Sequence, residues 1–284
     1  MQELTKRQIA QLLANSIEGI YGEEAQRMAD RYSKNNRTIT SILLQFINDF
    51  YQKVAKDKEK EPVLAIAENI ALYLLVFYRD LHKASPSEAE NFLTGLIIDR
   101  QGVEGSKLIG QFQGLVEAAV AFKKIIPFNE YMPLWQQSQK LIHAYNEFLG
   151  GLFGYMIIGL KTILKQKCDP RKILYSSYGN KVSEFNSLTH GVFIELTNIA
   201  QPKLRNALAH GGVWHDRSND NVYYNDRDKQ YEMSLVNFVG LGYVGSYLCE
   251  VYIVVLSAAL IIYYGHEEEK ESLPSAVKEI FQLM

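Results

Sequence analysis

The chain has 284 residues, 47% of them hydrophobic and 22% charged, with a formal net charge of −2 at pH 7. This length and apolar content exclude a disordered protein and allow a substantial core in one large or two ordinary domains. A charge so close to neutral gives no bulk attraction for nucleic acid, so an RNA site would need a local group of cations.

Cysteine usage and the N-terminal residues indicate the compartment. Cys168 and Cys249 are far apart and lack CxxC spacing, which suits a reducing cytoplasm and argues against a zinc knuckle or a disulfide scaffold. Residues 1–7 lack the apolar core of a secretory signal, so export is not expected. We therefore predict a cytoplasmic protein.

Apolar residues at helical spacing predict helices through the first half of the chain. We expect helical segments at 4–35 with a break near Tyr21 and Gly22, at 40–55, 62–82 and 87–99, and from 114 to 126. The stretch 102–114 shows the least organisation. Pro127 and Pro133 predict a boundary between a helical region of unknown role, 1–130, and a second helical domain, 131–284.

A long helix is predicted at 134–166, and its glycines at 150, 151, 154 and 159 predict close packing within the chain or against a second copy. A basic cluster then follows, with one acid, Asp169, among its cations. Its members are Lys161, Lys165, Lys167, Arg171 and Lys172. The cluster is either a phosphate-binding patch or the solvated end of a helix whose dipole favours cations, and both interpretations stay open. Asp169 and Pro170 predict a helix start, and a further helix is expected at about 192–200.

Residues 202–212, PKLRNALAHGG, combine a helix start, a polar triad and a helix stop. Proline suits the first helical turn, and glycine suits the position just past the last one. Asn206 and His210 are four residues apart and share a helix face, while Arg205 is rotated by roughly 100° and must reach with its long side chain. We expect one cation, one amide and one imidazole to converge.

Residues 221–224 and 230–233 flank turn-forming residues and predict a small β-hairpin after this motif helix. Ser234 is expected to cap a long apolar helix, 235–264, and a last helix is expected at about 274–283. The predicted class is all-α, a helical bundle with one small β-hairpin after the motif helix. Trp214 and the hairpin tyrosines 223, 224 and 231 are expected either to stack on unpaired bases or to pack in the core.

Segment 235–264 is long enough to cross a bilayer, which needs roughly 20 apolar residues. It carries one charge, Glu250, near its middle, together with Asn237 and Ser246, and no basic cluster flanks it. These features favour a buried bundle helix over a membrane span. Whether the helix packs in the core or at a dimer interface is left open.

The pattern Arg-Asn-x-x-x-His at 205–210 resembles the signature of the HEPN superfamily. The resemblance implies an all-α metal-independent ribonuclease, a toxin or antiviral defence effector, in which two motifs of a homodimer face each other. It also implies a regulatory or antitoxin partner. The chain departs from the antitoxin-paired toxins at Gly212, where those proteins have a tyrosine two residues after the histidine.

The implied catalytic residues have distinct chemical roles. His210 can take a proton near neutral pH, Arg205 can neutralise charge on phosphorus, and Asn206 can hold the histidine or a phosphate oxygen. The RNA-binding residues are expected to be Lys161, Lys165, Lys167, Arg171, Lys172 and Lys203.

No metal or cofactor is expected, because neither a P-loop nor a GxGxxG is present and no Glu or Cys completes a ligand set around His210, His215 and Asp216. In the alternative, Arg205 pairs with an acid or caps carbonyls, and His210 is a helix-terminal residue held by the dipole. The chain would then be a non-catalytic HEPN-like helical module that binds RNA or a partner protein.

Overall fold

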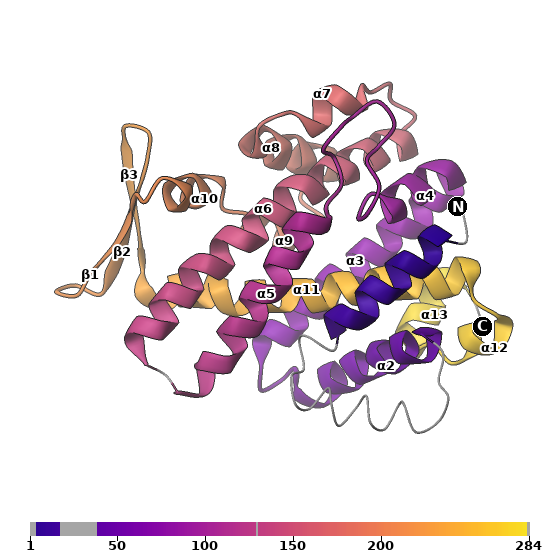
Figure 1. The fold of residues 1–284 in the computed structure, drawn as a ribbon, viewed down its shortest axis with the longest axis horizontal. Helices are drawn as coiled ribbons and strands as arrows, with labels where there is room; N and C mark the ends of the chain where they lie inside the picture. Colours follow the sequence, from indigo (N-terminus) through magenta and orange to yellow (C-terminus); the bar gives the residue numbers. More distant parts are fainter. Residues whose placement is uncertain (1–3, 18–38, 129, 283–284) are drawn as a thin grey trace.

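The computed structural model describes residues 4–17, 39–128 and 130–282. Helices dominate these residues, and a small antiparallel sheet stands at one end of the molecule (Figure 1). This confirms the predicted class. Residues 4–17 are helical. The further helices are α2 (Ile39–Asp57), α3 (Pro62–Ala84), α4 (Pro86–Thr94), α5 (Ile109–Ile125), α6 (Tyr131–Ile163), α7 (Pro170–Leu174), α8 (Tyr178–Thr189), α9 (Ile194–Ile199), α10 (Pro202–Ala209), α11 (Leu235–Tyr264), α12 (Glu267–Glu271) and α13 (Ser275–Phe281).

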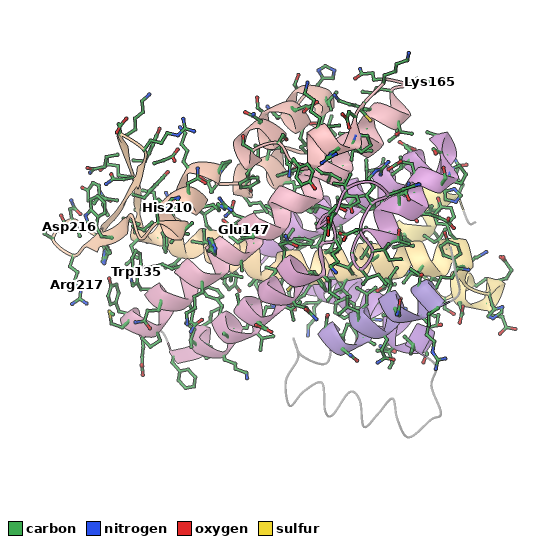
Figure 2. The ribbon with its side chains drawn as sticks, turned by 45° about the horizontal axis from the view of Figure 1, so that its top comes forward. Trp135, Glu147, Lys165, His210, Asp216 and Arg217 are labelled. Atoms are coloured by element: carbon green, nitrogen blue, oxygen red, sulfur yellow. The ribbon has the colours of Figure 1, made fainter. Side chains whose placement is uncertain are left out.

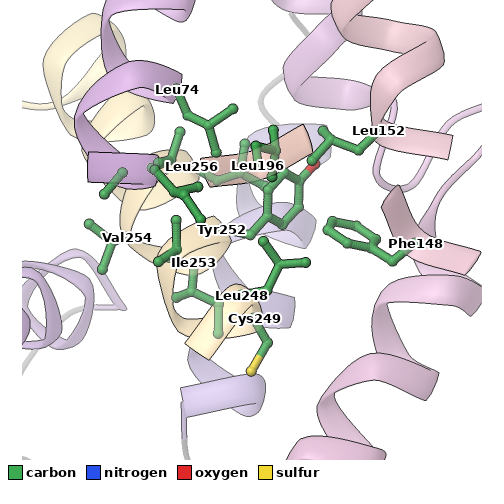
Figure 3. Close-up of a cluster of buried hydrophobic side chains, with 14 of the residues drawn as sticks. Leu74, Phe148, Leu152, Leu196, Leu248, Cys249, Tyr252, Ile253, Val254 and Leu256 are labelled. Atoms are coloured by element: carbon green, nitrogen blue, oxygen red, sulfur yellow. The ribbon is translucent and has the colours of Figure 1, made fainter. Parts of the chain in front are cut away.

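Helix α11 runs through the middle of the fold, with α2, α3, α5 and α6 packed around it (Figure 1). Its residues 245–262 are all buried, because a helix that is apolar on every face needs cover on every face. Around Tyr252 it meets Leu74 of α3, Phe148 of α6 and Leu196 of α9 (Figure 3). The open question about segment 235–264 is therefore answered: most of this helix packs in the core of its own chain.

Two of the described helices, α3 and α11, are long and apolar enough to cross a membrane by length and composition alone. The most apolar window of α11 is wholly buried within the protein, and half of the corresponding window of α3 is buried. Core helices of soluble proteins have the same properties, so this observation is weak evidence for a membrane span.

The sheet has the order β1 (Val213–Asp216), β2 (Asn221–Asp226) and β3 (Lys229–Ser234), with both pairs antiparallel. Strands β2 and β3 are the predicted hairpin, whereas β1 was not predicted. Strand β1 pairs with β2 along its four residues, and one of its side chains is also anchored to α6. His215 hydrogen-bonds the Tyr131 hydroxyl of α6 through Nδ1, and its Nε2 lies 3.0 Å from Asp220 Oδ1.

Several predicted element bounds change. Helix α5 begins at Ile109, inside the stretch predicted to be least organised, and the helix predicted at 87–99 ends at Thr94. Helices α8 and α12 were not predicted: α12 has five residues, none of them buried, and α8 buries few residues, so neither shows a clear apolar periodicity. The predicted break near Tyr21 and Gly22 lies outside the described residues. The predicted caps are confirmed: Asp169 Oδ1 accepts from the Arg171 amide, and Ser234 Oγ accepts from the Asn237 amide.

The glycines of α6 face other parts of the same chain. A Cβ on Gly154 would lie 2.9 Å from Leu174 of α7, and a Cβ on Gly159 would lie 2.6 Å from Phe77 of α3. The glycine face is therefore a packing surface within the chain, which is the first of its two predicted roles. The predicted boundary at 127–133 overlaps the first turn of α6, and buried side chains on both sides of it belong to one core.

Candidate functional site

The motif helix α10 begins and ends as its sequence predicts. Pro202 occupies the first turn, and Gly211 adopts φ +68°. The Gly212 amide donates to Ala207 O at 2.8 Å and the Gly211 amide to Leu208 O at 3.3 Å, the paired hydrogen bonds of a Schellman stop. His210 is therefore the C-cap residue, with its backbone fixed between the helix and the turn.

A chain of polar contacts crosses from α6 through α10 to the sheet. Arg205 Nε forms an ion pair with Glu147 Oε1, and Arg205 Nη1 donates to Asn206 Oδ1 at 3.1 Å. Asn206 Nδ2 in turn donates to Asp226 Oδ1 at 3.3 Å. About a third of the Arg205 and Glu147 side chains is exposed, so water screens this ion pair. The arrangement orients the guanidinium and leaves part of it accessible.

Asn146, the neighbour of Glu147 on α6, anchors the motif helix. Its side chain is buried, and Oδ1 accepts hydrogen bonds from the Tyr178 hydroxyl at 2.8 Å and from the Gln201 amide at 2.7 Å. Its Nδ2 donates to Ile142 O at 2.7 Å. One side chain thus joins the N-terminal ends of α8 and α10 to α6 and fixes where the motif begins.

Arg205 and Asn206 line an open cleft of about 1050 Å³ between α6, α8, α10 and the hairpin. Its charged lining residues are Lys181, Lys203, Arg205 and Arg227 against Glu147 and Asp226. Four cations against two acids make the cleft locally positive in a chain whose net charge is −2.

One end of the cleft has an aromatic wall. The Tyr224 and Tyr231 rings stack with their centroids 5.4 Å apart, and the Lys203 ammonium lies 4.3 Å from the Tyr231 centroid. Tyr224 is mostly buried, while Tyr231 is partly exposed. Tyr224 therefore belongs to the core, both rings line the cleft, and base stacking stays a prediction for Tyr231.

His210 lies apart from this cleft. It is exposed and is not among the cleft-lining residues, whereas Arg205 and Asn206 are. Figure 2 shows it between the sheet and Glu147 of α6. The expected face shared by Asn206 and His210 assumes a regular helix, but the backbone at His210 has already left it, with φ −107° and ψ 10°. Within one chain, the structure gathers two members of the triad and leaves the imidazole to solvent.

The basic cluster also lies away from the motif. Lys161 is 14 residues from Glu147 along α6, which is about 20 Å at the rise of an α-helix. Figure 2 shows Lys165 at the opposite end of the view from His210. Lys161 pairs with Glu184 at 2.6 Å, and Arg171 covers the Tyr175 ring. Lys203 is the one predicted RNA-binding residue that lines the cleft.

The described residues contain no group of three or more His, Cys, Asp or Glu side chains placed to hold a metal ion. His215 is buried against Tyr131 and Trp135, where it fixes β1 to α6. Comparisons of the chain with protein-family models, with curated proteins and with solved structures find no match. The HEPN resemblance therefore rests on residues 205–210 and on the all-α class.

Sequence reasoning did not find Glu147, Asn146 or Asp226, because their roles depend on contacts between distant segments. Glu147 could have been singled out, since it is the one acid in the sequence of α6, Tyr131–Ile163. A lone carboxylate in an apolar helix needs a partner or solvent. His143 lies one turn earlier, with Nε2 3.9 Å from Glu147 Oε1.

Proposed function

We propose that the chain is a cytoplasmic, metal-independent endoribonuclease of the HEPN type and that RNA lies in the cleft beside Arg205. One observation carries the proposal. The motif cation and amide form part of the wall of an open cleft whose lining has an excess of positive charge. RNA affinity depends mainly on phosphate contacts with such cations. The role as a toxin or antiviral defence effector rests on the resemblance.

In the proposed reaction the ribose 2′-oxygen attacks the adjacent phosphorus, and the bond from phosphorus to the 5′-oxygen breaks. His210 takes the 2′-hydroxyl proton, and Arg205 neutralises the charge that builds on the phosphorane. A second imidazole protonates the leaving oxygen. The products are a 2′,3′-cyclic phosphate and a 5′-hydroxyl.

The second imidazole is assigned to His210 of another copy. This fits the exposure of His210 at the sheet end, where Trp214, Val236 and Met132 are also exposed. We assign these apolar side chains to a two-fold contact, in place of the glycine face that α6 uses within the chain. In such a dimer the two His210 side chains should lie within about 10 Å, close enough to flank one phosphate.

The test is cleavage of single-stranded RNA by the full chain in the presence of a chelator. Wild-type protein should cut the RNA, leave a 2′,3′-cyclic phosphate, and leave a 2′-O-methyl version intact. His210→Ala should abolish cleavage without loss of helical content. His266→Ala is the matched control, because His266 is exposed and caps α12 at the far end of the molecule (Figure 1).

Two outcomes would contradict the proposal. Undiminished cleavage by His210→Ala would remove the assigned base, and loss of wild-type cleavage in chelator would refute the metal-independent mechanism. Sedimentation at micromolar concentration tests the dimer separately: an active monomer would refute the two-histidine arrangement.

A second candidate function is a non-catalytic helical module that binds RNA or a partner protein. A specific observation favours it: the Arg205 guanidinium already pairs with Glu147, and His210 stands outside the cleft. RNA binding without cleavage, unchanged by His210→Ala, would select this function over the ribonuclease.

A further inference from the structure

Lys181 is a buried lysine whose charge no acid among the described residues neutralises. Its exposed fraction is 7%, and its Nζ donates one hydrogen bond, to Gly150 O of α6 at 2.9 Å. Within the described part of the chain no carboxylate forms an ion pair with it, and the nearby Glu184 of the same helix pairs with Lys161 instead. An ammonium has three N–H donors, so two remain for a ligand.

The glycines of α6 make room for this side chain. Lys181 Cε and Nζ each lie 3.6 Å from the position that a Cβ on Gly154 would take. The aliphatic stem therefore lies across the glycine face, the ammonium is bonded to Gly150 O, and Lys181, Gly150 and Gly151 all help to line the cleft. Burial alone lowers the pKa of Lys181, as expected for a cation without a counter-charge.

The N-terminus of α8 opens into the same part of the cleft. Ser177 is the N-cap, and its Oγ accepts from the Asn180 amide at 3.3 Å. The amides of Tyr178 and Gly179 are the first two of the helix, where the backbone supplies no partner. Among the described residues a Cβ on Gly179 would meet just Pro202, at 4.0 Å, so the space beside the Gly179 Cα is open. Free amides at a helix N-terminus favour anions.

We propose that Lys181 and the first turn of α8 form a phosphate-binding subsite in the cleft. Lys181 Nζ donates its hydrogen bond to Gly150 O of α6. Gly150 lies about one helical turn along α6 from Glu147, the ion-pair partner of Arg205. The subsite therefore lies next to the motif residues. Its assignment to a phosphate of the RNA strand adjacent to the scissile one rests on the proposed function. The same chemistry would also accept a free phosphate.

Two probes separate these sources: inorganic phosphate, and a single-stranded 2′-deoxyoligonucleotide, which has no 2′-hydroxyl and cannot be cut by the proposed reaction. Binding to the full chain is measured by calorimetry for phosphate and by fluorescence anisotropy for the oligonucleotide. Lys181→Met keeps the stem in the glycine slot and removes the charge. Lys124→Met is the matched control, because Lys124 is exposed on α5 outside the cleft.

Wild-type protein and Lys124→Met should bind with similar affinity, while Lys181→Met should weaken binding roughly tenfold or more, as for loss of a hydrogen bond to a charged group. Gly179→Asp provides a second variant in case Lys181→Met does not fold. An acid in the first turn stabilises a helix, yet it should repel phosphate and weaken binding by a similar factor.

Equal affinities of wild type, Lys181→Met and Gly179→Asp would overturn the subsite, and so would absence of wild-type binding to both probes. Lys181-dependent binding of the oligonucleotide identifies a strand phosphate as the ligand. Lys181-dependent binding of inorganic phosphate without the oligonucleotide keeps the subsite and assigns it to a free phosphate. Neither probe requires turnover, so a failed RNA-cleavage assay leaves this test intact.

Discussion

Asn146→Ala removes the amide that joins α8 and α10 to α6. The Tyr178 hydroxyl and the Gln201 amide would both lose their acceptor. Each buried donor left without a partner costs about 1–3 kcal/mol. Because both donors are only part-buried and water can reach them, we expect a loss near the lower end, about 2–4 kcal/mol in the free energy of unfolding. That is a large part of the roughly 5–15 kcal/mol of a typical domain.

Urea unfolding of the full chain, followed by circular dichroism and tryptophan fluorescence, measures this loss. Tyr178→Phe should cost less, about 1 kcal/mol, because Asn146 Oδ1 keeps its bond from the Gln201 amide. The Asn146→Ala, Tyr178→Phe double variant should lose about 1 kcal/mol less than the sum of the two single losses, because both single variants remove the same hydrogen bond. A loss below 1 kcal/mol for Asn146→Ala, or strict additivity, would refute the tether.

Three further predictions concern stability. Gly114→Ala should stabilise the fold by about 0.5–1 kcal/mol, since a Cβ at this helical position meets no described residue within 4 Å. Gly159→Ala should destabilise it by about 1–3 kcal/mol, because a Cβ there would clash with Phe77; urea midpoints that shift the other way would contradict these two predictions. Glu250→Gln should lower the free energy of unfolding by about 2–3 kcal/mol, because it leaves the partly exposed Lys123 ammonium without its buried partner. The Glu250→Gln, Lys123→Met double variant should recover part of this loss. Burial raises the pKa of Tyr252, so the unfolded chain loses this proton first and stability should fall as pH rises above about 10; melting temperatures that stay flat to pH 11 would count against this.

Local rules predicted the element ends well. Pro202, Gly211 and Ser234 each satisfy or replace backbone groups within a few residues of themselves, so their effect can be read from the sequence. Strand β1 and helix α8 escaped prediction for the opposite reason. Strand β1 pairs with β2 and is anchored to α6 by the contact between His215 and Tyr131, which lie 84 residues apart, and α8 buries few side chains of its own.

The residues of the candidate site were likewise predictable only where the signal is local in sequence. Arg205 and Asn206 could be identified because they are neighbours on a predicted helix. Their pairing with Glu147 and Asp226 could not be predicted, since Glu147 is 58 residues from Arg205 and Asp226 is 20 residues from Asn206. The position of His210 depends on where the helix geometry stops, and a shift of one residue in that end changes the direction of the side chain.

Ser234 is both the last residue of β3 and the N-cap of α11, so no loop separates the sheet from the central helix. The Leu235 amide also bonds Asp220 O at 2.9 Å, which closes the base of the sheet. The aromatic wall of the cleft is thus fastened to the most buried helix of the protein and cannot swing as a flap. A bulky ligand that widens the cleft must instead displace α8 and α10, which Asn146, Glu147 and Gly150 hold to α6.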